Sequence, residues 1–426
     1  MGQSGGRELS FRQLMRGNIL VLTVSRVVWS VSMSIVFPYQ SLFIQALGGS
    51  KPMIGLITAL GSAAGMIFYP LGGYLADKSG RARLVGYATL LYALSFGVFV
   101  LAPTWEWLAV AVAVQQLVLF YMPALNAIMA DSIPPGARGR ILSLTIAVPE
   151  AVRILSPFVG GWLIEEYTLV PAMRTGYALS LVTALLVAAM RIRYLRETLE
   201  KQEFQWNIPR IFRESYSNVW GSVRWILGNM RGYSVIAVML IFIASLVQPF
   251  WVVYATEIGG LTPLQWGQLS LVAGLAKVAM SLIVGGVVDR LGPRRCMTLS
   301  ILIGAPAMLA FPHAEGFLQT TLVYIVLVLG NAFMWISSGV YLADAIPRAV
   351  RGRIMAGLGQ GVSLGISGGG YAQGFILFIP AMVGSVVSGF IYEANPAYPW
   401  YLNVAVMALC LAMVLRLMRE PDAAEV

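Results

Sequence analysis

Histidine, cysteine and charged residues are scarce in this chain of 426 residues, and each scarcity excludes a class of chemistry. The only histidine is His313, and the two cysteines, Cys296 and Cys410, lie far apart in the sequence. So few ligands exclude a disulfide framework, and we expect no metal site. Charged residues make up 11% of the chain, whereas soluble domains carry about 25%. Water is therefore not the main solvent of this protein.

The signature motifs of enzymes are also missing. The sequence contains no nucleotide-binding glycine loop, no zinc-binding motif and no nucleophile motif. We therefore expect neither an enzyme nor a cofactor. The formal net charge of +10 would suit a nucleic-acid binder, but the basic residues lie in alternate loops and not on one face or in one tail. No nucleic-acid partner is expected.

Long apolar runs dominate the sequence instead. Hydrophobic residues make up 58% of the chain, and runs such as 19–44 and 108–130 reach the ~20 residues that a spanning helix needs. The first run is too long for a cleaved signal peptide and is expected to remain as a helix. With turn and charge signals, the runs predict an all-α polytopic membrane protein with twelve transmembrane helices, near residues 18–46, 52–76, 82–102, 105–130, 139–164, 173–193, 233–257, 263–288, 295–312, 317–343, 353–392 and 398–417.

Positive residues predict how these helices cross the bilayer. Lysine and arginine gather in the connections after the even-numbered helices, for example Arg83, Arg191 and Arg290. The intervening connections carry mainly acids, such as Glu106 and Glu257. Because positive residues mark the cytoplasmic side, we expect a multi-pass protein of the plasma membrane with both termini inside the cell.

A polar stretch separates the two halves of the chain. Residues 196–232 are the only long polar segment, and apolar residues recur there at helical spacing, including Ile208, Ile211 and Phe212. This pattern predicts an amphipathic helix that lies on anionic lipid headgroups. A docking site for a regulatory protein is the alternative.

The chain repeats itself across this linker. Landmarks recur with shifts of 211 to 213 residues: Pro38 as Pro249; Gly73, Asp77, Lys78 and Arg83 as Gly285, Asp289, Arg290 and Arg295; and Asp131, Arg138 and Arg140 as Asp344, Arg351 and Arg353. Separated landmarks with nearly one offset imply two copies of a six-helix unit in the same orientation. We therefore expect two pseudo-symmetric halves, 1–195 and 233–426, joined by the linker 196–232.

With this loop signature, the chain resembles the major facilitator superfamily from its first helix to its last. The resemblance implies that two halves rock about a central site and so carry a small solute across the membrane. It also implies that the loop after helix two, and its copy after helix eight, are gates that switch conformation. We expect the protein to work as a monomer.

These loops are predicted to form an inner gate when the transporter faces outward. Arg83 is predicted to pair with Asp131, and the equivalent Arg295 with Asp344. Alternatively, the charges only fix the topology. The gating set is completed by glycines for close helix approach and by further loop residues: Gly73, Asp77, Lys78, Arg81, Arg138, Gly285, Asp289, Arg290 and Arg351.

Four charged residues fall well inside predicted helices: Arg26, Glu150, Arg153 and Lys277. A charge at the helix centre costs roughly 2.5 to 3.5 kcal/mol on insertion scales and is usually functional, so these are candidate substrate and coupling residues. Glu150 and Arg153 share a helical face; either they neutralise each other, or Glu150 carries the coupling proton. The set is net basic, which favours anionic solutes; alternatively, Lys277 snorkels to the interface and Arg26 caps a neighbouring helix.

Two helices carry unusual proline and glycine patterns. Ser156, Pro157, Gly160 and Gly161 resemble a segment of proton-coupled antiporters, except that serine replaces the leading glycine, and they favour export slightly over uptake.

Helix eleven has gained about ten residues, since Pro380 follows Pro157 by 223 positions, whereas the other landmarks recur after 211 to 213. At ~1.5 Å per residue, a straight helix over 353–392 would be ~60 Å long, about twice the thickness of the hydrocarbon core. We expect a break there, either a functional hinge or a tolerated cytoplasmic insertion.

Together, these features predict a secondary active transporter that moves a small organic solute by alternating access and couples it to protons. The alternatives are a membrane-embedded scramblase or enzyme, and a transport-inactive receptor on the same scaffold. Polar and aromatic residues either form bonds between helices or line the cavity and set its specificity: Gln40, Gln115, Gln116, Asn126, Gln248, Trp251, Asn331, Trp335 and Gln373.

Overall fold

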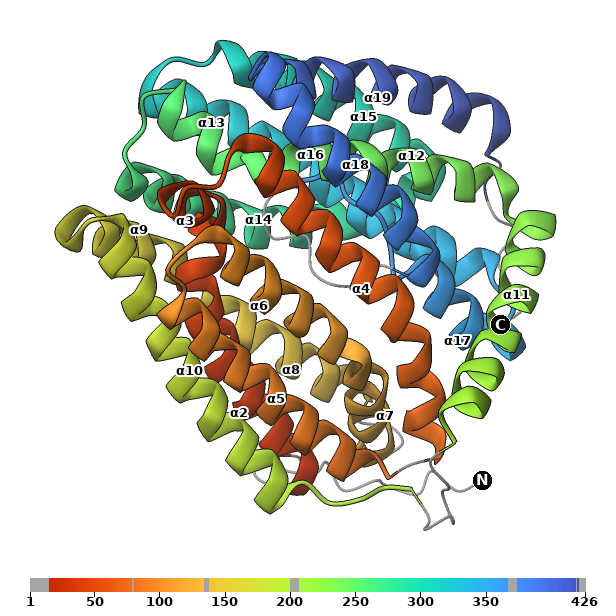
Figure 1. The fold of residues 1–426 in the computed structure, drawn as a ribbon. Coiled ribbons are helices and arrows are strands. Elements are labelled where there is room, and N and C mark those ends of the chain that lie inside the picture. Colours follow the sequence, from red (N-terminus) through yellow and green to blue (C-terminus); the bar gives the residue numbers. More distant parts are fainter. Residues whose placement is uncertain are drawn as a thin grey trace.

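The computed structural model describes residues 15–78, 80–133, 138–199, 207–366, 374–418 and 420, and every regular element in them is a helix (Figure 1). The predicted all-helical fold is confirmed. Each of the twelve predicted spans has a counterpart long and apolar enough to cross a membrane: 17–46, 51–76, 81–101, 105–132, 147–167, 169–194, 231–257, 263–291, 293–313, 316–345, 375–394 and 398–417.

Several spans consist of two helices with a short 3-10 turn between them. The first half of the structure comprises α2 (Gly17–Val36), η1 (Phe37–Tyr39), α3 (Gln40–Ala46), α4 (Lys51–Lys78), α5 (Arg81–Leu101), α6 (Trp105–Val118), η2 (Leu119–Tyr121), α7 (Met122–Ser132), α8 (Arg138–Arg153), α9 (Ser156–Tyr167) and α10 (Leu169–Tyr194). After α11 (Ile208–Asn229), the second half comprises α12 (Arg231–Val247), η3 (Gln248–Phe250), α13 (Trp251–Glu257), α14 (Pro263–Leu291), α15 (Pro293–Ala310), η4 (Phe311–His313), α16 (Gly316–Ala345), α17 (Arg348–Leu358), η5 (Phe375–Leu377), α18 (Phe378–Ala394) and α19 (Tyr398–Leu417).

Proline interrupts the first and seventh spans at matching places. Pro38 lies in η1 and Pro249 in η3, at the shift of the sequence repeat. Since proline has no N–H to donate, it breaks the α-helical ladder. The fifth span also breaks: α8 ends at Arg153, and α9 begins with Pro157 in its first turn. The prediction of one continuous helix over 139–164 was therefore wrong, because this proline was not treated as a breaker.

The predicted break in helix eleven is confirmed. α17 ends at Leu358, Gly359 has a φ of +81°, and α18 begins only at Phe378. The chain after Gly359 is not a surface insertion, because Val362 and Leu364 are fully buried and the N–H of Leu364 donates to Asn331 Oδ1 at 2.8 Å. This buried, hydrogen-bonded backbone contradicts the simpler interpretation of a tolerated cytoplasmic insertion.

The two halves pack against each other along two helix pairs. α4 lies beside α18, and α9 contacts α14 (Figure 1). Leucines such as Leu101, Leu282 and Leu318 project from the outer helices with 69–80% of their surface exposed. Apolar side chains facing outward and backbone groups bonded within helices are what a lipid environment requires.

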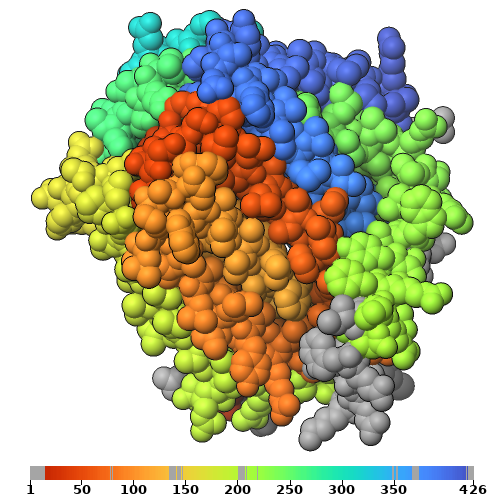
Figure 2. Space-filling model, in the orientation of Figure 1, coloured from red at the N-terminus to blue at the C-terminus, as the bar shows by residue number. Residues whose placement is uncertain are grey.

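The amphipathic helix of the linker is α11, and it bridges the halves. Ile211 packs against Leu71 and Leu75 of α4, and Tyr216 Oη donates to the carbonyl of Ile67 at 2.5 Å. Further along α11, Ile226 is 2% exposed and contacts Gly357 of α17. Figure 2 shows this yellow-green helix against the orange end of α4 and the blue α17–α18 region. Protein therefore covers Ile211 and Ile226, whereas Trp220 and Leu227 are 65% and 56% exposed; the predicted contact with lipid headgroups stays a prediction.

Candidate functional site

Contacts between the halves close one end of the molecule. Lys51, at the start of α4, forms an ion pair with Glu257, at the end of α13, and Gln45 Nε2 donates to the same carboxylate at 2.8 Å. Tyr39 Oη donates to the carbonyl of Pro157 at 2.7 Å and lies 3.2 Å from that of Pro263. We call this the closed end. The sequence reasoning did not predict this ion pair, since Lys51 and Glu257 lie 206 positions apart on helices of different halves.

Glycines let the helices meet tightly at the closed end. A Cβ added to Gly55 would lie 2.3 Å from the carbonyl oxygen of Ser385, and one added to Gly389 would lie 2.6 Å from Pro52 Cα. Both contacts join α4 to α18. Because real Cβ atoms do not approach other atoms this closely, only glycine permits this packing.

The opposite end carries the residues of the predicted gate. The predicted ion pair of Arg83 with Asp131 is not the one that forms. Asp131 of α7 pairs with Arg81, whose Nη1 lies 2.5 Å from Asp131 Oδ2, whereas Arg83 is exposed. Arg81 is the first residue of α5, and two residues further the helix has turned by about 200°, so Arg83 faces away. Glu197 completes the cluster by accepting the backbone N–H of Arg81 at 3.1 Å.

In the second half, the predicted pair of Arg295 and Asp344 is not formed within the residues that the structure describes. Arg295 is exposed, as are Asp289 and Arg290. Arg351 instead donates to the carbonyls of Ala343 and Ile346 at 2.6 and 3.1 Å, at the end of α16. It therefore caps a helix of its own half.

The gating glycines do not face close neighbours in this conformation. A Cβ added to Gly73 or Gly285 would meet nothing within 4 Å, whereas one added to Gly72 would lie 1.8 Å from the carbonyl oxygen of Phe120. The predicted close approach therefore occurs one residue earlier. Lys78 is exposed. The side chains of Asp77 and Arg138 lie outside the described residues.

Three of the four predicted intramembrane charges come together where the turn after α8 contacts α14. Arg153 Nη2 lies 2.6 Å from Glu150 Oε2, which confirms their pairing within one helix. The charge of Lys277 interacts with both residues from the other half. Gly274, one turn before Lys277, contacts Ile154 next to Arg153. Glu150, Arg153 and Lys277 thus form a charged cluster that spans the two halves.

The fourth charge, Arg26, lies elsewhere, beside an arginine that the sequence reasoning assigned to a loop. Arg191 of α10 is 3% exposed, and its Nη1 donates to Thr89 Oγ1 at 2.8 Å. Its guanidinium carbon lies 5.9 Å from the ring centroid of Tyr121. The charge of Arg26 interacts with Arg191 and with Tyr121. The signal that was missed is position: Arg191 stands 22 residues after Leu169, inside the helix.

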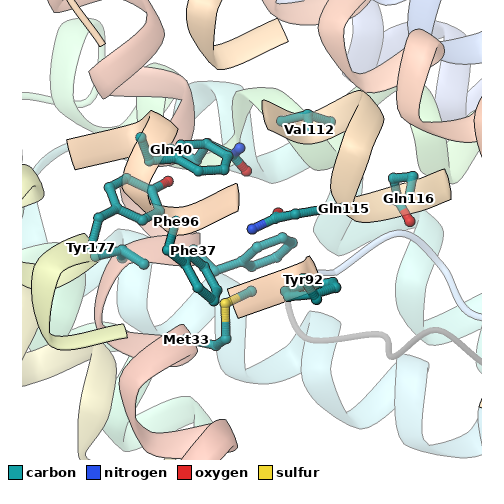
Figure 3. Close-up of a pocket in the computed structure, with 11 residues that line it drawn as sticks. Met33, Phe37, Gln40, Tyr92, Phe96, Val112, Gln115, Gln116 and Tyr177 are labelled. Atoms are coloured by element: carbon teal, nitrogen blue, oxygen red, sulfur yellow. The ribbon is translucent and has the colours of Figure 1, made fainter. Parts of the chain in front are cut away.

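An aromatic pocket lies within the first half (Figure 3). It is a cavity of about 50 Å³ lined by residues of α2, η1, α3, α5, α6 and α10, three of them glutamines. Gln115 Nε2 is buried and has no hydrogen-bond partner, and in Figure 3 its side chain extends toward the aromatic residues. The lining residues are Met33, Val36, Phe37, Gln40, Tyr92, Phe96, Phe99, Val112, Gln115, Gln116 and Tyr177.

Other predicted polar positions have structural roles. Trp251 Nε1 donates to the carbonyl of Gly365 at 2.7 Å, and Asn331 accepts from Leu364. Both side chains hold the broken helix eleven in place. Of the predicted polar set, Gln40, Gln115 and Gln116 therefore line the cavity just described, whereas Trp251 and Asn331 do not.

Comparisons with known proteins agree with this architecture. The family model of the Major Facilitator Superfamily matches residues 22–370 and 233–426. The chain is 23% identical over 352 residues to the multi-drug resistance efflux pump PmrA of Streptococcus pneumoniae serotype 4, covering 80% of this chain and 84% of that protein. It is 21% identical over 406 residues to multidrug resistance protein 2 of Bacillus subtilis, covering 93% and 94%.

Among solved structures, a D-xylose-proton symporter superposes with a TM-score of 0.67 at 16% identity, covering 96% of this chain and 99% of that one. Efflux pumps and a symporter thus share this fold, so the fold alone does not set the direction of transport. The twelve spans, the family match and the relatives place the chain in the plasma membrane as a multi-pass protein without enzymatic activity. This chain belongs to the Major Facilitator Superfamily of transporters.

Proposed function

We propose that the protein is a proton-coupled exporter of small amphipathic organic solutes that works by alternating access. The observation that carries this proposal is the cluster of Glu150, Arg153 and Lys277, where the turn after α8 contacts α14. It contains a single acid with two cations, one of them on the opposite half. The aromatic side chains and glutamines of the pocket offer both apolar and polar contacts, and in this conformation the cavity of about 50 Å³ holds only a small part of an organic solute. The relatives named as multidrug pumps favour export.

The cluster offers a direct coupling mechanism. While Glu150 is ionised, it offsets the charges of Arg153 and Lys277 across the interface between the halves. When Glu150 takes up a proton, its pairing with Arg153 is lost, and two unneutralised cations repel each other across that interface. Protonation therefore favours separation of Lys277 on α14 from Arg153 at the end of α8, which is the movement that alternating access needs.

The positive loops indicate which side each end faces. We propose that the end with Arg81 and Asp131 is cytoplasmic, so that the structure is closed to the outside and both termini lie inside. We further propose that residues 1–195 and 233–426 move as units about the linker 196–232, that the protein acts as a monomer, and that it has no nucleic-acid partner.

Proteoliposomes with an imposed pH gradient test this proposal. Wild-type protein should move a fluorescent anionic dye, Lucifer yellow, against its gradient, and Glu150→Gln should abolish gradient-driven accumulation while downhill exchange persists. Accumulation that is unchanged in Glu150→Gln would refute the coupling role. Lipid flip-flop or chemical turnover without a gradient would indicate a scramblase or an enzyme, and ligand binding without flux would indicate a receptor.

A further inference from the structure

Arg26 of α2 and Arg191 of α10 lie on helices that pack against each other in the first half, and their charges interact. Arg191 donates one hydrogen bond, to the neutral hydroxyl of Thr89, and its Nε is buried without a partner. The Thr89 hydroxyl is itself committed as a donor to the carbonyl of Val85 at 2.6 Å. Across the described ranges, no aspartate or glutamate forms an ion pair with Arg191 or with Arg26.

This arrangement is costly unless something else supplies negative charge. A buried guanidinium loses its hydration, and a second cation beside it adds repulsion. The face of the Tyr121 ring offers only weak compensation at 5.9 Å. Guanidinium groups carry five N–H donors in a planar fork that matches carboxylate and phosphate oxygens. An oxyanion is therefore the kind of ligand that would neutralise Arg26 and Arg191 and accept their N–H groups.

The second half shows that the fold does not need charge here. The repeat shifts pair Arg26 with Ala237, Thr89 with Ile301 and Tyr121 with Met334. Pro157 and Glu197 recur 223 residues later as Pro380 and Glu420, and the same shift pairs Arg191 with Val414. All four counterparts in the second half are apolar and no more than 1% exposed: Ala237, Ile301, Met334 and Val414. Apolar side chains are therefore sufficient to pack the equivalent region of the second half, and packing alone does not explain the two arginines in the first half.

We propose that Arg26 and Arg191 bind the oxyanion group, a carboxylate or a phosphate, of an amphipathic solute inside the first half. In so far as the solute is transported, this proposal rests on the proposed function. The anion reaches the site from the side of Arg26, which is partly exposed. Met33 of the aromatic pocket lies seven residues further along α2, or ~10 Å. A small apolar group at the pocket can therefore belong to the same molecule as the anion.

Equilibrium binding to the purified full-length protein tests the site without requiring transport. The probes are 4-phenylbutyrate, its neutral amide and inorganic phosphate, measured by isothermal titration calorimetry at constant ionic strength. Phenylbutyrate should bind at least about tenfold more tightly than the amide, because its carboxylate accepts hydrogen bonds from charged guanidinium groups and the neutral amide accepts weaker ones. Arg191→Gln and Arg26→Gln should each weaken phenylbutyrate binding about ten- to hundredfold. Arg193→Gln, an exposed position on the same helix, should leave binding unchanged.

The outcomes separate the possible sources of the anion. Tight phenylbutyrate binding that phosphate displaces supports an organic solute, and binding of phosphate alone supports a free inorganic anion in the same site. The proposal is overturned if neither probe binds, or if both glutamine variants bind like the wild type. If Arg191→Gln does not fold, the binding measured with Arg26→Gln tests the proposal, because the Arg26 side chain is partly exposed and its replacement should leave the fold intact. If phenylbutyrate or phosphate binds but the dye is not transported, the anion site is supported and the exporter proposal is refuted. If the dye is transported but neither probe binds, the exporter proposal is supported and the anion site is refuted.

Discussion

The ion pair between Lys51 and Glu257 is expected to hold the closed end shut. Their side chains are 21% and 39% exposed, so solvent screens the pair and its contribution is at most about 1 kcal/mol. The hydrogen bond from Gln45 to the same carboxylate adds about 0.5–1.5 kcal/mol. Glu257→Gln should thus shift the equilibrium toward opening of this end by about 1–2 kcal/mol, roughly a five- to thirtyfold change in the population ratio.

Distance measurements between spin labels report this shift directly. Ser50 and Ile258 are exposed at the closed end, one in each half, and suit Ser50→Cys and Ile258→Cys labelling. The native cysteines, Cys296 and Cys410, are free and buried, and are replaced by alanine. Double electron–electron resonance should show one short distance in the wild type and a second, longer distance in Glu257→Gln.

Two controls separate the ion pair from general damage at this end. Glu393→Gln removes an exposed acid at the same end of the molecule and should leave the distances unchanged. Exchanging the charges in the double variant Lys51→Glu with Glu257→Lys should restore the short distance. If Glu257→Gln gives the wild-type distribution, the glycine contacts at Gly55 and Gly389 hold this end closed and the reasoning about the ion pair is wrong.

Three further predictions concern the other end and the linker. Gly72→Ala should lower thermal stability by several degrees, because its Cβ would overlap a backbone carbonyl, whereas Gly73→Ala should have no effect in the same melting experiment. Arg81→Gln should slow dye efflux severalfold in proteoliposomes, while Arg83→Gln, on an exposed side chain, should retain wild-type flux. The hydrogen bond from the Arg210 guanidinium lowers the pKa of Glu214 in α11 below its usual range. The stabilisation from ionised Glu214 is therefore present above the usual pKa of a glutamate and is lost as the pH falls through the lowered pKa. Protease cleavage in α11 should increase in acid for the wild type and be pH-independent in Glu214→Gln.

The large-scale architecture could be predicted from the sequence because lipid imposes few solutions. Apolar runs of spanning length, prolines and loop charges each have one physical meaning in a bilayer. The break in helix eleven followed from length alone, since 353–392 cannot cross as one straight helix. The pairing of Glu150 with Arg153 followed from helical geometry within four residues. Local rules were sufficient wherever a feature depended on neighbouring residues.

Features that depend on tertiary packing could not be predicted in this way. Asp131 is 50 residues from Arg81 and 48 from Arg83, and only the direction of the first turn of α5 decides between the two arginines. Arg191 counted as one more positive residue near a helix end, although helix packing buries it. The turn that breaks span five depends on Pro157, which the sequence reasoning considered only as part of a motif.

The contacts at the two ends imply how the conformational cycle is balanced. The closed end is held by one partly exposed ion pair, the Tyr39 hydroxyl and glycine-mediated packing, all of which cross between the halves. At the predicted gate, the pair of Arg81 with Asp131 stays within one half and need not break, while Arg295 and Asp289 are exposed and form no ion pair within the described residues. Closing this end would exchange a small number of cross-half contacts at the closed end for new contacts at the gate. Under the proposed coupling, protonation of Glu150 would decide which end is open.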